Sequence, residues 1–245
     1  MKFDFKKLMP HAIAVVVFIV VALIYCKPVI EGKVLNATDN LGWKGMAQQS
    51  FEVREKQGIF PNWSNSMFGG MPTYHFAMEA KHKIMFAYVQ EVITLKLPKP
   101  ANFFFLACLC FYILALALRL NPWIAMMGAL AYGYSTYNPV IIGAGHDTKM
   151  LAMGYAPLMI AGLLLLFQKR WWVGIAALTT GASLQISTAH LQIVYYTLII
   201  LGILCIGFLI DSFRKKDTWS APTQRVECCI PSMTANYSLS GSPAR

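Results

Sequence analysis

The chain has 245 residues, of which 57% are hydrophobic and only 13% are charged, and its mean hydropathy is +0.51. Soluble domains carry about 25% charged residues, so this composition excludes an ordinary water-soluble globular domain. The formal net charge of +10 does not indicate nucleic-acid binding, because many basic residues lie at the ends of apolar runs and form no basic stripe. The sequence therefore predicts an all-α, polytopic membrane protein whose first partner is the lipid bilayer.

Six apolar runs follow one another along the chain, and each has about 18 to 23 residues, close to the length that a spanning helix needs. The runs are residues 8–26, 101–118, 123–145, 150–167, 171–189 and 191–210. The first run resembles a signal peptide, but no small-x-small cleavage site follows it, so we expect it to remain as a span. The third run is the least regular, because residues 133–139 interrupt it and Pro139 lacks a backbone N–H. We expect this segment to be shielded by protein or to lie at the interface, or the helix simply to end near Tyr137.

The basic residues give the orientation, because cytoplasmic segments are enriched in Lys and Arg. With six spans, four basic clusters fall on one side of the membrane. They are Lys2, Lys6 and Lys7, then Arg119, then Lys169 and Arg170, then Arg214, Lys215 and Lys216. The sequence therefore predicts a cytoplasmic N-terminus and a large external loop over residues 27–100.

The external loop is too long for a simple connection and should carry structure of its own. A helix is expected from Thr38 or Asp39 to the stop at residues 57–58, and a second helix over residues 83–95 could lie flat on the membrane surface. Residues 1–216 thus form the membrane region. The polar tail, residues 217–245, has no periodicity, and it is either a disordered terminus or the product of a reading-frame change.

Polar residues at a membrane surface are candidates for function. Asp39 follows the first run on the external side and could act as a general base, or it could cap a helix. His146, Asp147 and Lys149 lie in a turn before the fourth run. Backbone amides at that helix start, with His146 and Lys149, could hold a phosphate group. The alternative is an ordinary turn that Asp147 or Thr148 caps, with Lys149 snorkelling to the interface.

Three further side chains on the external side are weaker candidates. His190 joins the fifth and sixth runs and could bind a ligand or titrate, although a single His at an interface is more often structural. Trp43 and Trp63 could stack on a sugar, but Trp also occurs at any membrane interface. A divalent metal held by Asp39, His146 and Asp147 is conceivable, yet no ligand spacing supports it, so neither a metal nor another cofactor is expected.

Several motifs resemble the N-terminal part of the YfhO-type bacterial membrane proteins, which are related to the GT-C class of glycosyltransferases. The motifs are LMPH (residues 8–11), residues 25–32, WKGM (43–46), WSNSMFGGMP (63–72), NPW (121–123) and GHDTK (145–149). The resemblance covers residues 1–216, and residues 63–72 and 145–149 are its most specific parts. It implies a GT-C-like fold in the bacterial cytoplasmic membrane. The implied donor is a polyprenyl-phosphate-linked sugar, and the implied acceptor is a cell-envelope glycan, polymer or lipid on the outer face.

The resemblance also implies roles for individual residues. Asp39 matches the position of the catalytic carboxylate in the first external loop, which takes the proton from the acceptor hydroxyl. The GHDTK stretch, with His146, Asp147 and Lys149, would bind the donor phosphate and offset its charge. The other expected substrate-binding residues are Trp43, Lys44, Trp63 and His190. Family members are several times longer, so this chain is expected to be a truncated portion of such a protein, and a truncated donor pocket would make it inactive.

Two other functions stay open. A transporter or lipid-linked-sugar flippase usually places charged groups near the bilayer midplane, whereas the polar candidates here gather at the outer surface. A non-catalytic membrane scaffold or inactive fragment is consistent with the chain length and the unusual tail. The sequence predicts neither the sugar, the acceptor nor the oligomeric state.

Overall fold

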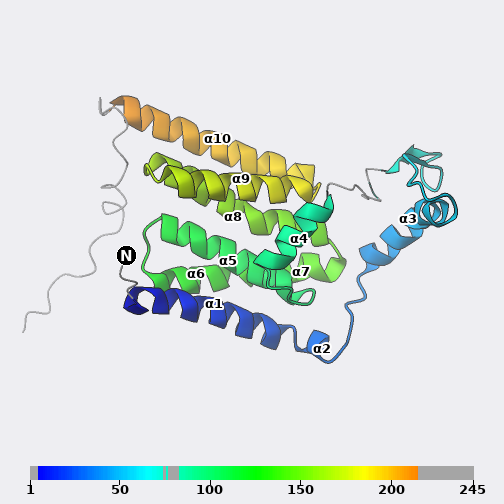
Figure 1. Ribbon diagram of the computed structural model, residues 1–245, viewed down its shortest axis with the longest axis horizontal. Helices are drawn as coiled ribbons and strands as arrows, with labels where there is room; N and C mark the ends of the chain where they lie inside the picture. The colour runs from blue at the N-terminus through cyan, green and yellow to red at the C-terminus, as the bar shows by residue number, and fades with distance from the viewer. Residues whose placement is uncertain (1–4, 74–75, 77–82, 215–245) are drawn as a thin grey trace, which may run out of the picture.

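A computed structural model of the protein describes residues 5–73, 76 and 83–214, and its architecture is all-α (Figure 1). Within these residues there are ten helices and one antiparallel pair of two-residue strands. The helices are α1 (Phe5–Tyr25), α2 (Lys27–Ile30), α3 (Thr38–Gln57), α4 (Lys83–Ile93), α5 (Ala101–Ala117), α6 (Pro122–Gly133), α7 (Tyr137–Ala144), α8 (Asp147–Phe167), α9 (Trp171–Ser187) and α10 (Leu191–Arg214), and the strands are β1 (Trp63–Ser64) and β2 (Met71–Pro72). The expected tail lies outside the described residues.

The long helices lie side by side as a bundle of rods (Figure 1). Helices α6 and α7 are shorter and follow one another along the length of the bundle. Helix α5 packs against α1, α6 and α8, and α8 packs in turn against α9 and α10. The main apolar core contains Phe103, Phe104 and Phe105 of α5, which are at most 2% exposed. Helix α10 is the outermost rod, and most of its apolar side chains are exposed, as expected for a helix that faces lipid.

Among the described residues, three helices are long and apolar enough to cross a membrane: the Leu8–Tyr25 part of α1, α8 and α10. Helix α5 is equally apolar but has 17 residues, and α9 also has 17. By helix length and composition the protein is therefore a membrane protein. The described residues thus support the all-α membrane prediction in its coarse form.

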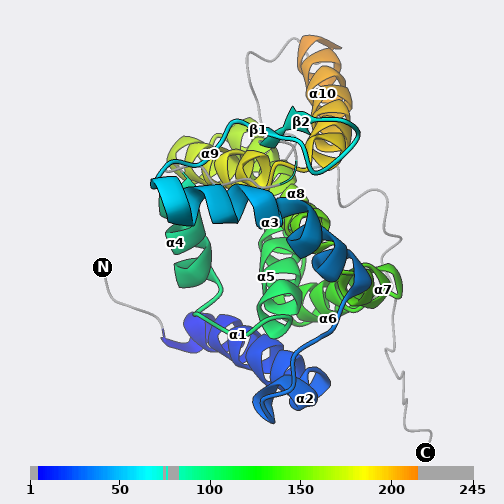
Figure 2. The same cartoon turned by 90° about the vertical axis from the view of Figure 1, so that its right-hand side faces the viewer.

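The two ends of the bundle are formed by different segments of the chain. The start of α1, the α5–α6 and α8–α9 connections and the end of α10 lie at one end, at the left of Figure 1. These segments contain Arg119, Lys169, Arg170 and Arg214. Helices α2, α3 and α7 and the β1–β2 hairpin lie at the opposite end and cover it in the end-on view (Figure 2). Four of the basic residues that were predicted to share one side of the membrane, Arg119, Lys169, Arg170 and Arg214, therefore share one end of the bundle.

The irregular third run is two helices rather than one. Helix α6 ends at Gly133, before the predicted stop near Tyr137, and α7 begins at Tyr137. Asn138 is 2% exposed, and its Nδ2 donates to the backbone oxygens of Tyr132 (2.9 Å) and Gly133 (3.0 Å). These carbonyls stand at the C-terminal end of α6, where intrahelical partners run out. The Asn138 side chain thus closes the end of α6 from within the protein, whereas Ser135, Thr136 and Tyr137 at the break are exposed.

Residues 27–100, which were predicted to form an external loop, contain the two predicted helices. Helix α3 occupies Thr38–Gln57 and ends at Gly58, whose left-handed φ of 69° and N–H bond to the Arg54 oxygen form a typical helix stop. Helix α4 occupies Lys83–Ile93 and packs against α9. The glycine-rich segment between them folds back as the β1–β2 hairpin, in which Trp63 pairs with Pro72.

Glycines hold α8 and α9 close together. A Cβ added at Gly162 of α8 would lie 2.5 Å from the backbone nitrogen of Leu178 in α9, and one at Gly174 of α9 would lie 2.8 Å from the backbone nitrogen of Leu166. Small residues at such contacts let two helices approach closely within a membrane. The α8–α9 interface therefore depends on the absence of a side chain at these positions.

Candidate functional site

Two predicted site residues meet at the α3 end of the bundle. Asp39 lies in the first turn of α3, and His146 immediately precedes α8. Asp39 Oδ2 lies 3.2 Å from His146 Nε2, and the side chains are 53% and 49% exposed respectively. The carboxylate and the imidazole therefore lie within ion-pair distance of each other, and both remain open to solvent.

A glycine allows this contact between distant parts of the chain. Gly145 ends α7 with a φ of 101°, which residues with a side chain rarely adopt. A Cβ at this position would lie 2.9 Å from the Ala37 Cβ and 3.2 Å from the Asn40 nitrogen. The turn between α7 and α8 thus rests directly on the start of α3, and this contact brings His146 to Asp39.

The predicted capping roles are wrong. The residue before α3 is Ala37 and the residue before α8 is His146, and neither helix start has a side-chain cap hydrogen bond. Asp39 and Asp147 instead lie within the first turns, where a negative charge interacts favourably with the helix dipole. Both helix starts therefore retain backbone N–H groups that no side chain caps.

The other members of the GHDTK stretch contact different partners. Asp147 Oδ2 lies 3.3 Å from the Lys99 Nζ in the segment before α5. Lys149 Nζ lies 5.1 Å from the centre of the Tyr137 ring, a cation–π contact. The Lys149 ammonium group therefore lies over the Tyr137 ring, and Lys99 is a basic site residue that sequence reasoning missed.

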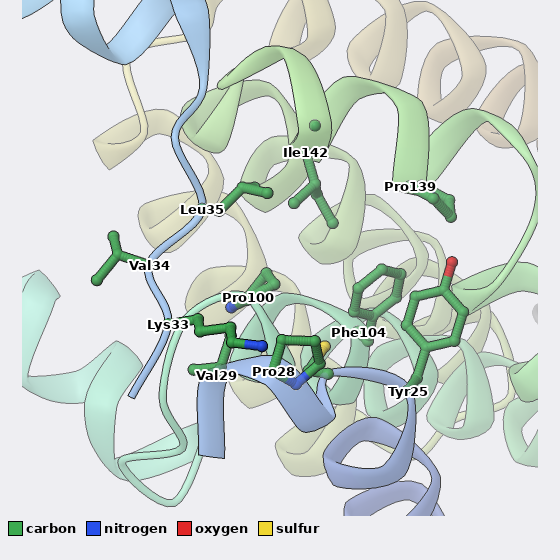
Figure 3. Close-up of a pocket in the computed structure, with 12 residues that line it drawn as sticks. Tyr25, Pro28, Val29, Lys33, Val34, Leu35, Pro100, Phe104, Pro139 and Ile142 are labelled. Carbon is green, nitrogen blue, oxygen red and sulfur yellow. The ribbon is translucent and has the colours of Figure 1, made fainter. Parts of the chain in front are cut away.

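A cleft with two parts adjoins the pair. An apolar cavity of about 420 Å³ lies between the end of α1, α2, the start of α5 and α7, and Figure 3 shows Tyr25, Phe104 and Ile142 among its walls. A neighbouring cavity of about 480 Å³ is lined in part by Lys99, Asn40 and Asp147. Sequence reasoning gave no signal for this cleft, because its walls come from four separate segments.

His190 lies near this cluster without joining the pair. Burial, and then the nearby positive charge of Lys149 and His146, lower the pKa of the His190 imidazole below its usual value. Its Nε2 atom is buried and has no hydrogen-bond partner in the part of the chain that the structure describes. His190 is therefore held in its neutral form.

We expect His190 to make the stability of the protein fall as the pH falls. The unfolded imidazole has a pKa of about 6.5, and the folded pKa is lower, so below that pH the unfolded state binds more protons. The stabilisation is present above the unfolded pKa and is lost as the pH falls toward the folded pKa. Between about pH 7.5 and pH 5.5, the thermal unfolding temperature in detergent should fall more for the wild type than for His190→Gln. Equal slopes for the two proteins would contradict this role.

Three other predicted substrate-binding residues lie apart from the pair. Trp43 Nε1 donates to the Phe76 backbone oxygen at 2.5 Å, and Trp63 Nε1 donates to Asn65 Oδ1 at 3.1 Å. Lys44 lines a shallow depression on α3 with Gln48, Phe51, Glu52 and Glu55. The structure therefore gives Trp43 and Trp63 roles within the external loop and places Lys44 on a separate surface.

No Asp, Glu, Lys or Arg is buried among the side chains that the structure describes. Within the same residues no group of three or more His, Cys, Asp and Glu side chains could hold a metal ion, and Asp147 pairs with Lys99 instead.

Comparison with known proteins finds no matching family model, no matching curated protein and no matching solved structure. The assignment of function therefore depends on the geometry of this end of the bundle.

Proposed function

We propose that the protein is a membrane glycosyltransferase of the YfhO type, with a GT-C-like bundle that places Asp39 at the outer face of a bacterial cytoplasmic membrane. The observation that carries this proposal is the 3.2 Å contact between Asp39 and His146 beside an accessible cleft. A carboxylate that is oriented by an imidazole and still open to solvent suits a general base.

In this proposal six segments cross the membrane: α1, α5, α6 with α7, α8, α9 and α10. The location of Arg119, Lys169, Arg170 and Arg214 at the opposite end of the bundle from Asp39 supports a cytoplasmic N-terminus. Helices α5 and α9, with 17 residues each, reach the required length with their flanking residues.

The reaction is transfer of a sugar from a polyprenyl phosphate to a hydroxyl group of an envelope glycan, polymer or lipid. Asp39 takes the proton of the acceptor hydroxyl while that oxygen forms a bond to the anomeric carbon. The bond between the anomeric carbon and the phosphate oxygen breaks, and its electron pair leaves with the polyprenyl phosphate. His146 orients the Asp39 carboxylate, and the uncapped start of α8 and nearby basic side chains offset the charge on the departing phosphate.

Proteoliposomes that contain the full chain and polyprenyl-phosphate hexoses with a radioactive sugar test this proposal. With an envelope extract as acceptor, we expect label to move from the lipid to the acceptor and free polyprenyl phosphate to form. Movement of intact donor between leaflets without its consumption would favour the flippase alternative instead. Neither transfer nor movement would favour the scaffold alternative.

A further inference from the structure

The cleft beside the Asp39–His146 pair has an apolar half and a charged half. The apolar half is lined by Pro28 and Val29 of α2, Pro139 and Ile142 of α7, and Phe104 of α5 (Figure 3). Its volume of about 420 Å³ is in the range of small-molecule sites. This half is therefore shaped for an apolar ligand of limited size.

The charged half continues directly from the apolar half. The two cavities share six lining residues: Val29, Lys33, Val34, Leu35, Pro100 and Ile142. Lys33 is one of these shared lining residues, whereas Lys99 lines the charged half. A molecule with an apolar chain and a negative end group could thus fill both halves at once.

We propose that this cleft binds one lipid chain that ends in a phosphate, with the chain in the apolar half and the phosphate between Lys33 and Lys99. This inference builds on the proposed function, because it gives the lipid carrier of the donor a place next to Asp39. It differs from the expectation from sequence, in which Lys149 and His146 hold the phosphate.

The existing ion pairs of the two lysines leave them available to a phosphate. Lys33 Nζ lies 3.4 Å from Glu31 Oε2, and Lys99 Nζ lies 3.3 Å from Asp147 Oδ2. Both lysine side chains are well exposed, at 73% and 64%, and exposed ion pairs are weak. Among the residues that line the charged half, Lys33 and Lys99 are positive and Asp147 is negative. The excess positive charge complements an anionic end group.

The position of the cleft connects lipid binding to the reacting groups. Asn40 follows Asp39 in the sequence, Asp147 follows His146, and both Asn40 and Asp147 line the charged half. A phosphate held there lies beside the base without contact with Lys149, whose ammonium group lies over Tyr137. The lipid site and the pair therefore belong to one end of the bundle but consist of different side chains.

Native mass spectrometry of the purified full chain in detergent tests the inference with farnesyl phosphate as the probe. We expect one bound farnesyl phosphate, and about tenfold weaker binding of farnesol, which lacks the phosphate. Inorganic phosphate and phosphatidylglycerol serve as the two competing sources of a phosphate group. Full competition by inorganic phosphate alone would reduce the site to an anion site, and stronger binding of phosphatidylglycerol would assign it to bulk phospholipid; either result overturns the proposal.

Variants locate the two halves of the site. Leu35→Trp should abolish binding by filling the apolar half, whereas Ile30→Trp, on α2 outside the lining, should not. The double variant Lys33→Gln and Lys99→Gln should lower farnesyl phosphate affinity about tenfold and leave farnesol unchanged, with Lys56→Gln as the control. Unchanged affinity in both cleft variants would overturn the proposal.

These experiments distinguish a failure of lipid binding from a failure of sugar transfer. Farnesyl phosphate binding without any sugar transfer in proteoliposomes would contradict the proposed function and leave the lipid site intact. Sugar transfer that persists at the wild-type rate in Leu35→Trp and in the double lysine variant would contradict the lipid site alone.

Discussion

Replacement of Asp39 with asparagine should lower sugar transfer by about 100-fold to 10,000-fold, the range that general-base catalysis supplies. Asparagine keeps the size of the side chain but cannot accept the proton of the acceptor hydroxyl. The Asp39 side chain is half exposed, so its replacement leaves the packing of α3 largely intact. The proteoliposome transfer assay, normalised to protein content, measures the effect.

Three further variants separate catalysis from folding. Glu55→Gln makes the same chemical change on α3 away from the pair and should transfer sugar at the wild-type rate. His146→Gln should cause a smaller loss, because His146 acts through Asp39. The double variant Asp39→Asn with His146→Gln should then be no slower than Asp39→Asn alone. Full transfer by Asp39→Asn would remove Asp39 from the reaction.

Replacement of Gly162 with leucine should destabilise the bundle strongly. A Cβ at Gly162 would lie 2.5 Å from the Leu178 nitrogen and 2.7 Å from the Leu178 Cα, both of which are backbone atoms that cannot turn aside. Helices α8 and α9 must then separate, and overpacking of this kind costs about 1–3 kcal/mol or more. The fraction of folded protein after heating in detergent, measured by size-exclusion chromatography, reports the loss.

Gly202→Leu is the matched control for Gly162→Leu. Gly202 lies on the exposed side of α10, and a Cβ there would meet no atom within 4 Å. Leucine should therefore be tolerated at this position. Equal stability of the two leucine variants would contradict the close α8–α9 contact.

The positions of the helices could be predicted from the sequence because the signals are local. Helix α3 begins at Thr38 and ends at Gln57 before Gly58, as the turn residues indicated, and the apolar runs set the other long helices. The break between α6 and α7 was visible in Pro139 and the glycine before it. The role of Asn138, whose amide bonds to two carbonyl groups of α6, was not visible, because it depends on how the chain folds back.

The site could be predicted only as single residues. Asp39 and His146 were both candidates, but their pairing depends on the close approach of Gly145 to Ala37, which no local pattern encodes. Lys99 carried no signal, because a lysine between two prolines reads as a loop residue until Asp147 comes within 3.3 Å of it. In the same way, no feature of the sequence indicates that the Lys149 ammonium group lies over Tyr137 rather than beside the Asp39–His146 pair.

Trp43 and Trp63 differ from the Asp39–His146 pair in the kind of evidence behind them. Trp43 and Trp63 had the right residue type for sugar stacking, and residue type was the main argument for them. In the structure the indole N–H groups of both residues donate to partners within the external loop. A residue type common at membrane interfaces is thus weak evidence for a site without a second signal.

The central claim is that Asp39 and His146 lie at the outer end of a six-span bundle, and single-cysteine labelling of intact cells tests it most directly. In a background with the six native cysteines replaced by alanine, Thr148→Cys probes the Asp39 end and Lys169→Cys probes the opposite end. A membrane-impermeant maleimide should label Thr148→Cys in intact cells and Lys169→Cys only after permeabilisation. Labelling of both positions from the same side, or of Lys169→Cys alone in intact cells, would contradict the six-span orientation and the location of the site.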